Sequence, residues 1–489
     1  MTKKFTIILF FLFSVSFLVA QSFEDFVKQE KANYTQHVNR YHKELKELRD
    51  KQNAEYADML RGEWTKSDAS EAQKQPARPE PPKPKIAEPE QQPKGDEMPV
   101  GEIVSKPKEE PKQELKPTVP VEDKPKAEPK KNLFAFEFYG TKCEVDFDKS
   151  NVFYLKSVDE NGVADAWLKL SDDSYTPLIS DCLLLRKELD LSDWGYVKFV
   201  EILSSKIFEQ SKTNEAKVFQ MYVLTQSGYE ARIARTGDKL VLLLPFTSTL
   251  YEYPYLNIEG GKYYVIDKNK KSSYFVFNKK FPNEQRLSLQ LAKEPRLSQT
   301  ITKQRILSSK RYKDFEVNVK INKNLIDFYN DFPRSDNWSV YSKASLSEEV
   351  KQAIYPVMKS KIAGKSQKDA VDIILNFVQT SLDYQTDDEQ FGYERPLFAD
   401  ESLFYPYSDC EDRSILFSVL VRELVGLEVA FLEYPNHLAT AVKFSEDVKG
   451  DYLMVGGEKF VICDPTYIGA GVGLAMPDFK NVQVGVIRI

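Results

Sequence analysis

The sequence predicts an α+β protein, and the clearest evidence lies in its C-terminal part, residues 331–489. Two segments with helical periodicity, Leu346–Ile362 and Lys368–Tyr384, are followed by a third helical pattern at Glu411–Leu424. Runs rich in β-branched and aromatic residues then predict strands. The four strand candidates are Glu428–Tyr434, Leu438–Phe444, Lys459–Asp464 and Val482–Ile489. Helices followed by a run of strands are typical of an α+β domain with an antiparallel sheet.

The first twenty residues predict export. Lys3 and Lys4 precede the apolar run Phe5–Ala20, and the polar residue Gln21 follows. This is the layout of a signal peptide over residues 1–20, and the run is short for a membrane span. The alternative is an uncleaved N-terminal anchor. No later stretch of the sequence could span a bilayer, so we expect a mature protein in the periplasm or cell envelope of a bacterium, or outside the cell.

Residues 22–65 predict one long helix, because the segment is charged and nearly free of Gly and Pro. Its apolar residues recur at spacings of three, four and seven, which places them on one helical stripe. They are Val27, Tyr34, Val38, Tyr41, Leu45, Leu48, Tyr56 and Met59. A stripe this narrow is typical of a weak coiled coil, which implies self-association, or of a helix docked on an envelope partner. A solvated helix without a partner fits the pattern equally well.

Residues 66–131 predict a disordered linker. The segment is rich in Pro, Lys and Glu, and fourteen of the 26 prolines of the chain fall between Pro76 and Pro129. Such a tract cannot bury enough apolar surface to offset the entropy lost on ordering. At roughly 3 Å per residue, an extended linker of this length would reach on the order of 100–200 Å.

The middle region, residues 132–330, predicts a second α+β unit. Strand-like alternation in Asn132–Phe147 precedes helical periodicity over Leu183–Gln210. Apolar strand patterns follow at Ala231–Pro245 and Gly261–Asp267.

The net charge and the number of cysteines restrict the classes of protein that the sequence fits. A net charge of −6 gives no reason to expect a nucleic-acid partner, which would need a concentrated basic face. Four cysteines are too few for a disulfide-dense scaffold. Cys143 and Cys182 could pair in an exported protein, which would leave Cys410 as a thiol. Cys463 lies in an apolar strand pattern and reads as a small core residue.

Cys410 is the candidate nucleophile. It follows Ser408 and Asp409, which are good N-cap residue types, and it precedes a strongly periodic apolar helix. The unpaired N–H groups and the positive dipole end at a helix N-terminus favour the thiolate, which is the reactive form.

His437 and Asp464 complete a candidate catalytic set with Cys410. His437 opens one predicted strand and Asp464 closes another, so neighbouring antiparallel strands could bring both to the start of the helix. The set then contains a nucleophile, a base and a carboxylate that orients the base. His437 is the only histidine outside the segment 22–65. Taken singly, each of the three residues fits a structural role. A metal site is not expected, because one histidine and no paired or convergent ligand spacing are poor evidence for one.

Around these residues the sequence resembles the transglutaminase-like superfamily, which includes bacterial transglutaminase-like cysteine peptidases. The matching segments are Asp409–Asp412, Asn436–His437 and Asp464–Pro465, with a similar turn after the last of them. Ser408 stands where the family commonly has Gly, and Ser414 stands where it commonly has a small apolar residue. The resemblance covers about 30% of the chain and is more specific for the fold than for the substrate.

The resemblance implies a papain/transglutaminase-like domain at 331–489, with a helical lobe and an antiparallel sheet. It also implies acyl transfer through a thioester. Cys410 would attack an amide carbonyl, His437 would exchange protons and Asp464 would orient His437. The backbone N–H of Cys410 would be one oxyanion donor, with Tyr405 or Tyr407 as candidates for the second. No cofactor is implied.

The middle region shows a weak internal repeat of this pattern. When Gly228 is aligned with Gly426, Lys212 falls opposite Cys410 and Lys239 falls opposite His437. With one residue inserted, Asp267 falls opposite Asp464. We therefore hypothesise a degenerate transglutaminase-like copy over about 135–270, used for binding or positioning. Two unrelated helix–strand units that share a glycine are the alternative.

The sequence as a whole predicts an exported cysteine peptidase or amidase that acts on a peptide or protein substrate through Cys410, His437 and Asp464. Transamidation is the subordinate version of this prediction. The alternative is a non-catalytic envelope protein that keeps the fold for binding or as a scaffold.

Overall fold

The computed structural model describes residues 2–74, 85–88, 93–104, 115–119, 132–267, 273–335 and 337–489, with the backbone alone for residues 2–26. It has a mixed α+β architecture, as the sequence predicts, with two six-stranded sheets in the described chain. The side chains of the predicted signal peptide and the rest of the tract 66–131 lie outside the described residues. Within the described part of the chain, no helix combines the length and the apolar character needed to cross a bilayer.

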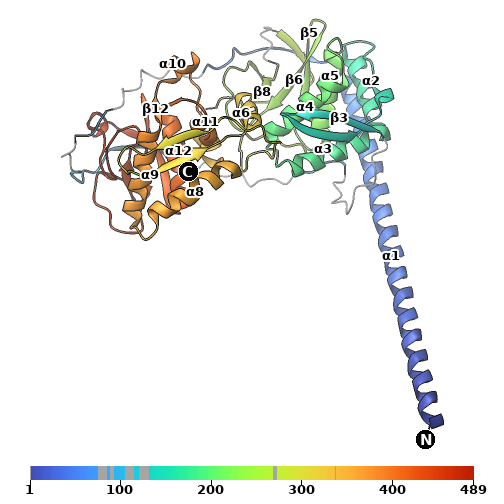
Figure 1. Ribbon diagram of the computed structural model, residues 1–489. Coiled ribbons are helices and arrows are strands. Elements are labelled where there is room, and N and C mark those ends of the chain that lie inside the picture. The colour runs from blue at the N-terminus through green and yellow to red at the C-terminus, as the bar shows by residue number, and fades with distance from the viewer. Residues whose placement is uncertain are drawn as a thin grey trace.

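Helix α1 (Thr2–Leu60) is continuous through the predicted signal peptide and the predicted long helix, and it projects from the body of the molecule (Figure 1). The apolar residues of its stripe at Tyr34, Tyr41 and Leu48 are exposed. The end of the helix packs on the chain itself, where Tyr56 is fully buried against the rings of Trp167, Phe277 and Phe281. The C-terminal end of α1 therefore packs on the middle region of the same chain.

The middle region contains a hairpin, four α-helices and a sheet. The hairpin is β3 (Leu133–Phe138) and β4 (Thr141–Asp146). The helices are α2 (Glu160–Leu170), α3 (Thr176–Glu188), α4 (Asp193–Ile207) and α5 (Thr213–Gln226). The strands of the sheet are β1 (Thr65–Asp68), β5 (Arg232–Thr236), β6 (Lys239–Pro245), β7 (Tyr255–Ile258), β8 (Gly261–Val265) and β9 (Ser273–Val276), in the order β1-β9-β5-β6-β8-β7.

The C-terminal region is likewise built from helices and a six-stranded sheet. Its helices are α6 (Lys323–Asn330), α7 (Trp338–Lys343), α8 (Glu348–Ile362), α9 (Gln367–Ser381), α10 (Asp387–Phe391), α11 (Ala399–Phe404) and α12 (Cys410–Leu424). Its sheet contains β2 (Val100–Val104), β14 (Glu428–Tyr434), β15 (His437–Lys443), β16 (Tyr452–Val455), β17 (Glu458–Cys463) and β18 (Val484–Arg488). The order is β16-β17-β15-β14-β18-β2. A small parallel pair, β12 (Asp383–Tyr384) and β13 (Tyr407–Ser408), leads into α12.

The two sheets have the same strand order. Read from the edge formed by β2, the C-terminal order matches the middle sheet strand for strand, with β14 and β15 in the places of β5 and β6. Helices α5 and α12 pack against β6 and β15, respectively. Gly228 and Gly426, which end these helices, both have positive φ (95° and 74°), a conformation that favours glycine after a helix. The outer strands differ, because β1 is antiparallel to β9 whereas β2 is parallel to β18.

The described parts of the tract 66–131 differ from the predicted disordered linker. Strands β1 and β2 extend the two sheets, and Ala87 donates its N–H to the carbonyl of Ile468 at 2.8 Å. Met98 is buried in an apolar cluster with Tyr434 and Phe479. These segments find backbone partners on the sheet edges and apolar contacts on one face, which composition alone does not reveal.

Residues before the predicted boundary at residue 331 pack on the C-terminal helices. The hairpin of β10 (Arg305–Ser308) and β11 (Glu316–Val319) packs on α8 and α9, and α6 packs on α11. One buried apolar cluster runs from the end of α1 through both units to α12. The middle and C-terminal units therefore share a core.

Candidate active site

Cys410 is the first residue of α12 and is buried, with 1% of its surface exposed. Asp409 is the N-cap, and its N–H donates to Oδ2 of Asp412 at 3.3 Å. Ser414, one turn further along, donates its hydroxyl to the carbonyl of Leu438 at 2.8 Å. Residues four apart lie on the same face of a helix, so Cys410 lies on the face of α12 that meets the start of β15.

His437 and Asp464 are hydrogen-bonded to each other. His437 opens β15, Asp464 follows β17, and these two strands are paired in the sheet. The distance from His437 Nε2 to Asp464 Oδ2 is 2.9 Å. The other oxygen, Oδ1, accepts the N–H of Thr466 at 2.9 Å. A carboxylate is an acceptor, so this contact favours the imidazole tautomer with its proton on Nε2.

The remaining imidazole nitrogen is the one suited to act as a base. Nδ1 of His437 is buried and has no hydrogen-bond partner within the described residues. The ring is held nearly parallel to Phe479, with centroids 4.9 Å apart, and to Tyr434, at 6.2 Å. A fixed ring with Nε2 on the carboxylate leaves the lone pair of Nδ1 for a proton from a neighbouring nucleophile.

Gln379 of α9 holds the loop that follows Asp464. Its amide nitrogen donates to the carbonyls of Asp464, Tyr467 and Ala470 at 3.0, 2.8 and 3.0 Å, respectively. Its amide oxygen accepts the N–H of Gly469 at 3.2 Å. This buried side chain positions the carboxylate without touching the imidazole, and no sequence motif indicates it.

A buried acidic cluster surrounds Cys410. Its thiol donates to Oε2 of Glu411 at 3.1 Å. Burial and mutual repulsion raise the pKa values of Asp387, Asp409 and Asp412 well above the ordinary range. These carboxyls therefore resist ionisation, and any negative charge that they do carry opposes the effect of the helix N-terminus on the thiol. The guanidinium of Arg413 offsets part of that charge, although burial lowers its pKa.

The cluster corrects the expectation that no acidic groups converge here. The three aspartates Asp387, Asp409 and Asp412 have ligand oxygens within 4.8 Å of one another. Asp387 and Asp409 each keep one buried oxygen that has no hydrogen-bond partner in the described chain. An all-oxygen donor set of this kind could hold a hard divalent cation. Asp387 comes from α10, so no local spacing in the sequence signals the convergence.

Of the two tyrosines expected as oxyanion donors, Tyr405 has another role. Its hydroxyl donates to Oδ1 of Asn330 at 2.8 Å and accepts from Arg395 at 3.2 Å. The side chain of Tyr407 is 38% exposed, whereas Cys410 is buried.

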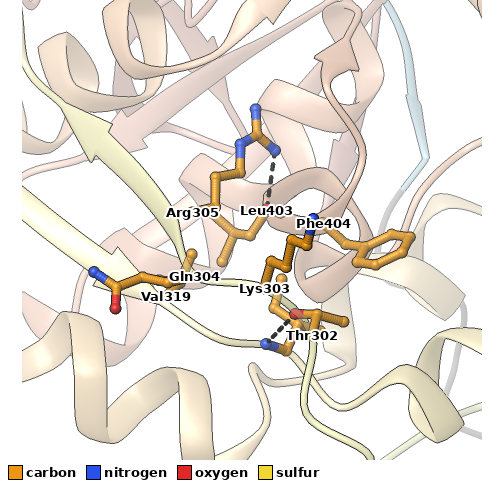
Figure 2. Close-up of a pocket in the computed structure, with 8 residues that line it drawn as sticks. Thr302, Lys303, Gln304, Arg305, Val319, Leu403 and Phe404 are labelled. Carbon is orange, nitrogen blue, oxygen red and sulfur yellow. Dashed lines mark hydrogen bonds between the residues drawn. The ribbon is translucent and has the colours of Figure 1, made fainter.

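The cavity drawn in Figure 2 lies beside the segment that leads to Cys410. It has a volume of about 350 Å³ and contains none of the three predicted catalytic residues. Its lining is Thr302, Lys303, Gln304, Arg305, Val319, Ile321, Leu403 and Phe404. Arg305 donates to the carbonyls of Leu403 (2.9 Å), Tyr405 and Pro406 (3.1 Å). This arginine therefore holds the segment that precedes Cys410 in place.

The aligned positions of the middle unit occupy equivalent places without the same chemistry. Lys212 is the N-cap of α5, Lys239 opens β6, and Asp267 follows β8. The ammonium group of Lys212 donates to the hydroxyl of Tyr154 at 3.3 Å. Two lysines in the places of a thiol and an imidazole cannot perform the same nucleophilic chemistry.

Comparisons of the chain with family models, with curated proteins and with solved structures find no match.

Proposed function

We propose that this protein is a cysteine-dependent acyl-transfer enzyme of the transglutaminase-like type, and that it acts as a peptidase or amidase. The observation that carries the proposal is the hydrogen bond between Nε2 of His437 and Asp464, which leaves a buried Nδ1 on β15, the strand that packs against α12. The position of Cys410 at that helix start supplies the nucleophile. The helices and antiparallel sheet of residues 331–489 support the family assignment.

The proposed reaction has two acyl-transfer steps. The Cys410 proton passes to Nδ1 of His437 while the sulfur forms a bond to the amide carbon, and the carbonyl π pair moves to oxygen. The intermediate collapses, and the amine leaves with the proton from His437. Water or an amine then attacks the thioester and regenerates the thiol. Asp464 stabilises the imidazolium through its hydrogen bond to Nε2.

The burial of the site favours an extended peptide segment as the substrate. Cys410, His437 and Asp464 are at most 2% exposed. An extended peptide segment is narrower than a folded protein surface, so it is the class of substrate that groups this deeply placed favour. We further propose, from the apolar run Phe5–Ala20, that the protein works outside the cytoplasm.

Alkylation with iodoacetamide at pH 7, followed by peptide mapping, tests the nucleophile. We expect Cys410 to react at least tenfold faster than Cys463, because burial raises the pKa of the Cys463 thiol. The variant His437→Ala should lower the Cys410 rate at least tenfold, whereas Cys463→Ser should leave it unchanged. An unreactive Cys410 in the folded protein would overturn the proposal.

A separate experiment identifies the acyl acceptor, which is water in a peptidase and an amine in a transglutaminase. Wild-type and Cys410→Ala proteins are compared on a panel of peptides with and without a primary amine. Hydrolysis that needs Cys410 supports the peptidase, and amine incorporation that needs it supports a transglutaminase.

A non-catalytic binding protein is the second candidate, and the acidic cluster favours it. Carboxyl groups packed around Cys410 disfavour its thiolate. Slow alkylation of Cys410 that is insensitive to His437→Ala would support this alternative.

A further inference from the structure

Tyr384 is placed beside the entrance to α12 by a short parallel strand pair. In the β12–β13 register, Asp383 pairs with Tyr407 and Tyr384 pairs with Ser408. Ser408 is followed by Asp409 and Cys410, so this pairing joins Tyr384 to the segment that carries the nucleophile. No pattern in the sequence indicates this pairing.

Arg413 fixes the position of this tyrosine. Its guanidinium lies 5.3 Å from the centroid of the Tyr384 ring. The same group donates to the carbonyl of Leu382 at 2.8 Å and to the hydroxyl of Ser408 at 3.2 Å. The guanidinium of Arg413 therefore contacts both segments of the pair, and this fixes the position of the Tyr384 side chain.

The hydroxyl of Tyr384 is buried and has no hydrogen-bond partner among the described residues. A buried polar group without a partner costs on the order of 1–3 kcal/mol, so such groups in a folded protein call for an explanation. A donor that finds its acceptor only during the reaction is one such explanation.

The phenol keeps its proton at neutral pH. Burial, followed by electrostatic repulsion from the acidic groups of Cys410, Asp409 and Glu411, raises the pKa of Tyr384 far above its usual value. The β12–β13 register places Tyr384 beside Ser408, two residues before the nucleophile. A neutral phenol can donate a hydrogen bond, whereas a phenolate cannot.

We propose that the hydroxyl of Tyr384 is the second oxyanion donor, acting with the backbone N–H of Cys410 in the first turn of α12. The inference rests on the proposed acyl transfer. When the sulfur bonds to the carbonyl carbon, the π pair moves to oxygen, and Tyr384 donates a hydrogen bond to that oxygen. The phenol keeps its own proton, and the pair returns to the carbonyl when the amine leaves. Tyr384 thus takes the role that the sequence suggested for Tyr405 or Tyr407.

The test compares two reactions of Cys410 in the same protein. Acylation by p-nitrophenyl acetate passes through an oxyanion, whereas alkylation by iodoacetamide does not. The variant Tyr384→Phe removes one oxygen and keeps the ring on Arg413. We expect acylation to slow by about 10²-fold relative to wild type, since an oxyanion donor is typically worth that factor or more. The alkylation rate should change less than threefold, and Tyr407→Phe is the matched control.

The ratio of the two rates decides the outcome. A ratio unchanged in Tyr384→Phe, including an equal fall of both rates, would overturn the assignment. Altered alkylation together with a lowered thermal midpoint would identify a destabilised variant, and both rates are then measured below that midpoint, where the ratio reports on Cys410 in the folded protein. A wild-type protein inert to both reagents would instead contradict the proposed function itself. A reactive wild type with an unaltered variant contradicts only the role of Tyr384.

Discussion

Gln379 shows how much of the candidate site depends on one residue outside the catalytic set. Its amide satisfies four backbone groups in the loop after Asp464. Each buried carbonyl left without a donor costs on the order of 1–3 kcal/mol. The orientation of Asp464, and hence of His437, should depend on this side chain.

We predict that Gln379→Ala lowers kcat of the Cys410-dependent reaction at least tenfold and leaves KM within about threefold. The reason is that a loosened Asp464 no longer holds the imidazole in its reactive tautomer. Steady-state kinetics on the substrate found in the peptide panel measure this effect. The exposed Gln299 provides the control, and Gln299→Ala should behave as wild type. Equal kinetics for Gln379→Ala and wild type would contradict the positioning role.

Asp400 makes the stability of the fold depend on pH. It is fully buried and accepts hydrogen bonds from Ser347, and burial raises its pKa to about 7. In the unfolded chain the carboxyl ionises near pH 4. Between these values the folded protein holds a proton that the unfolded chain has released, so stability falls as pH rises from about 4 to 7 and is level above.

We predict that Asp400 contributes a loss of up to about 4 kcal/mol in the free energy of unfolding over this range, because its pKa differs by about three pH units between the folded and the unfolded chain. Urea denaturation at pH 4.5 and pH 7.5 measures it. The variant Asp400→Asn, which cannot ionise, should show a smaller difference between the two values of pH. If both proteins lose stability equally, Asp400 is not the titrating group.

At the scale of elements, the helix and strands around the site follow closely from local patterns. The helix predicted at 411–424 is α12 at 410–424, and the strand predicted at 428–434 is β14 at the same bounds. The short helices α10 and α11 lie between the predicted helices 368–384 and 411–424, where no helical periodicity is predicted. Helices of five or six residues are marginal alone, so tertiary contacts decide whether they form.

The tract before the middle region is the element whose structure departs furthest from its composition. Met98 is 2% exposed in the apolar cluster that also contains Tyr434 and Phe479. Those two rings lie against His437, so the tract supports the wall of the candidate site.

We predict that Met98→Ala lowers the free energy of unfolding by about 2–5 kcal/mol, as for other buried methionines. Ile86, in the same tract but 78% exposed, gives the control, and Ile86→Ala should change stability by less than about 0.5 kcal/mol. Urea denaturation of the full chain measures both. A disordered tract would make both substitutions neutral.

At the scale of the whole molecule, the end of α1 is part of the body's core. Arg49 donates to Asp173 at 2.9 Å, and Asn53 accepts from the indole of Trp167 at 3.2 Å. Tyr56 fills the space between Trp167 and two phenylalanines. The end of α1 is thereby fixed to the middle region, while the rest of the helix projects from the body of the molecule (Figure 1).

We predict that Tyr56→Ala destabilises the protein by about 3–5 kcal/mol, because it leaves a cavity in a buried aromatic group. Tyr34→Ala, at a position 72% exposed on the same helix, should cost less than about 0.5 kcal/mol. Thermal unfolding, monitored by circular dichroism, measures the stability of both variants. Equal midpoints would show that α1 folds independently of the middle region.

The sequence by itself determined the element types of the two α+β units and the positions of Cys410, His437 and Asp464 at the ends of such elements. Periodicity, N-cap residues and turn glycines are local signals, so they can be read without a partner. Only the tertiary structure decided which distant groups meet at Cys410. Asp387, Gln379 and Tyr384 arrive from other segments through helix packing and the β12–β13 pairing, and their proximity depends on long-range contacts that leave no local pattern. The same reason explains why strands β1 and β2 emerge from a proline-rich tract, since only the edges of the folded sheets offer them partners.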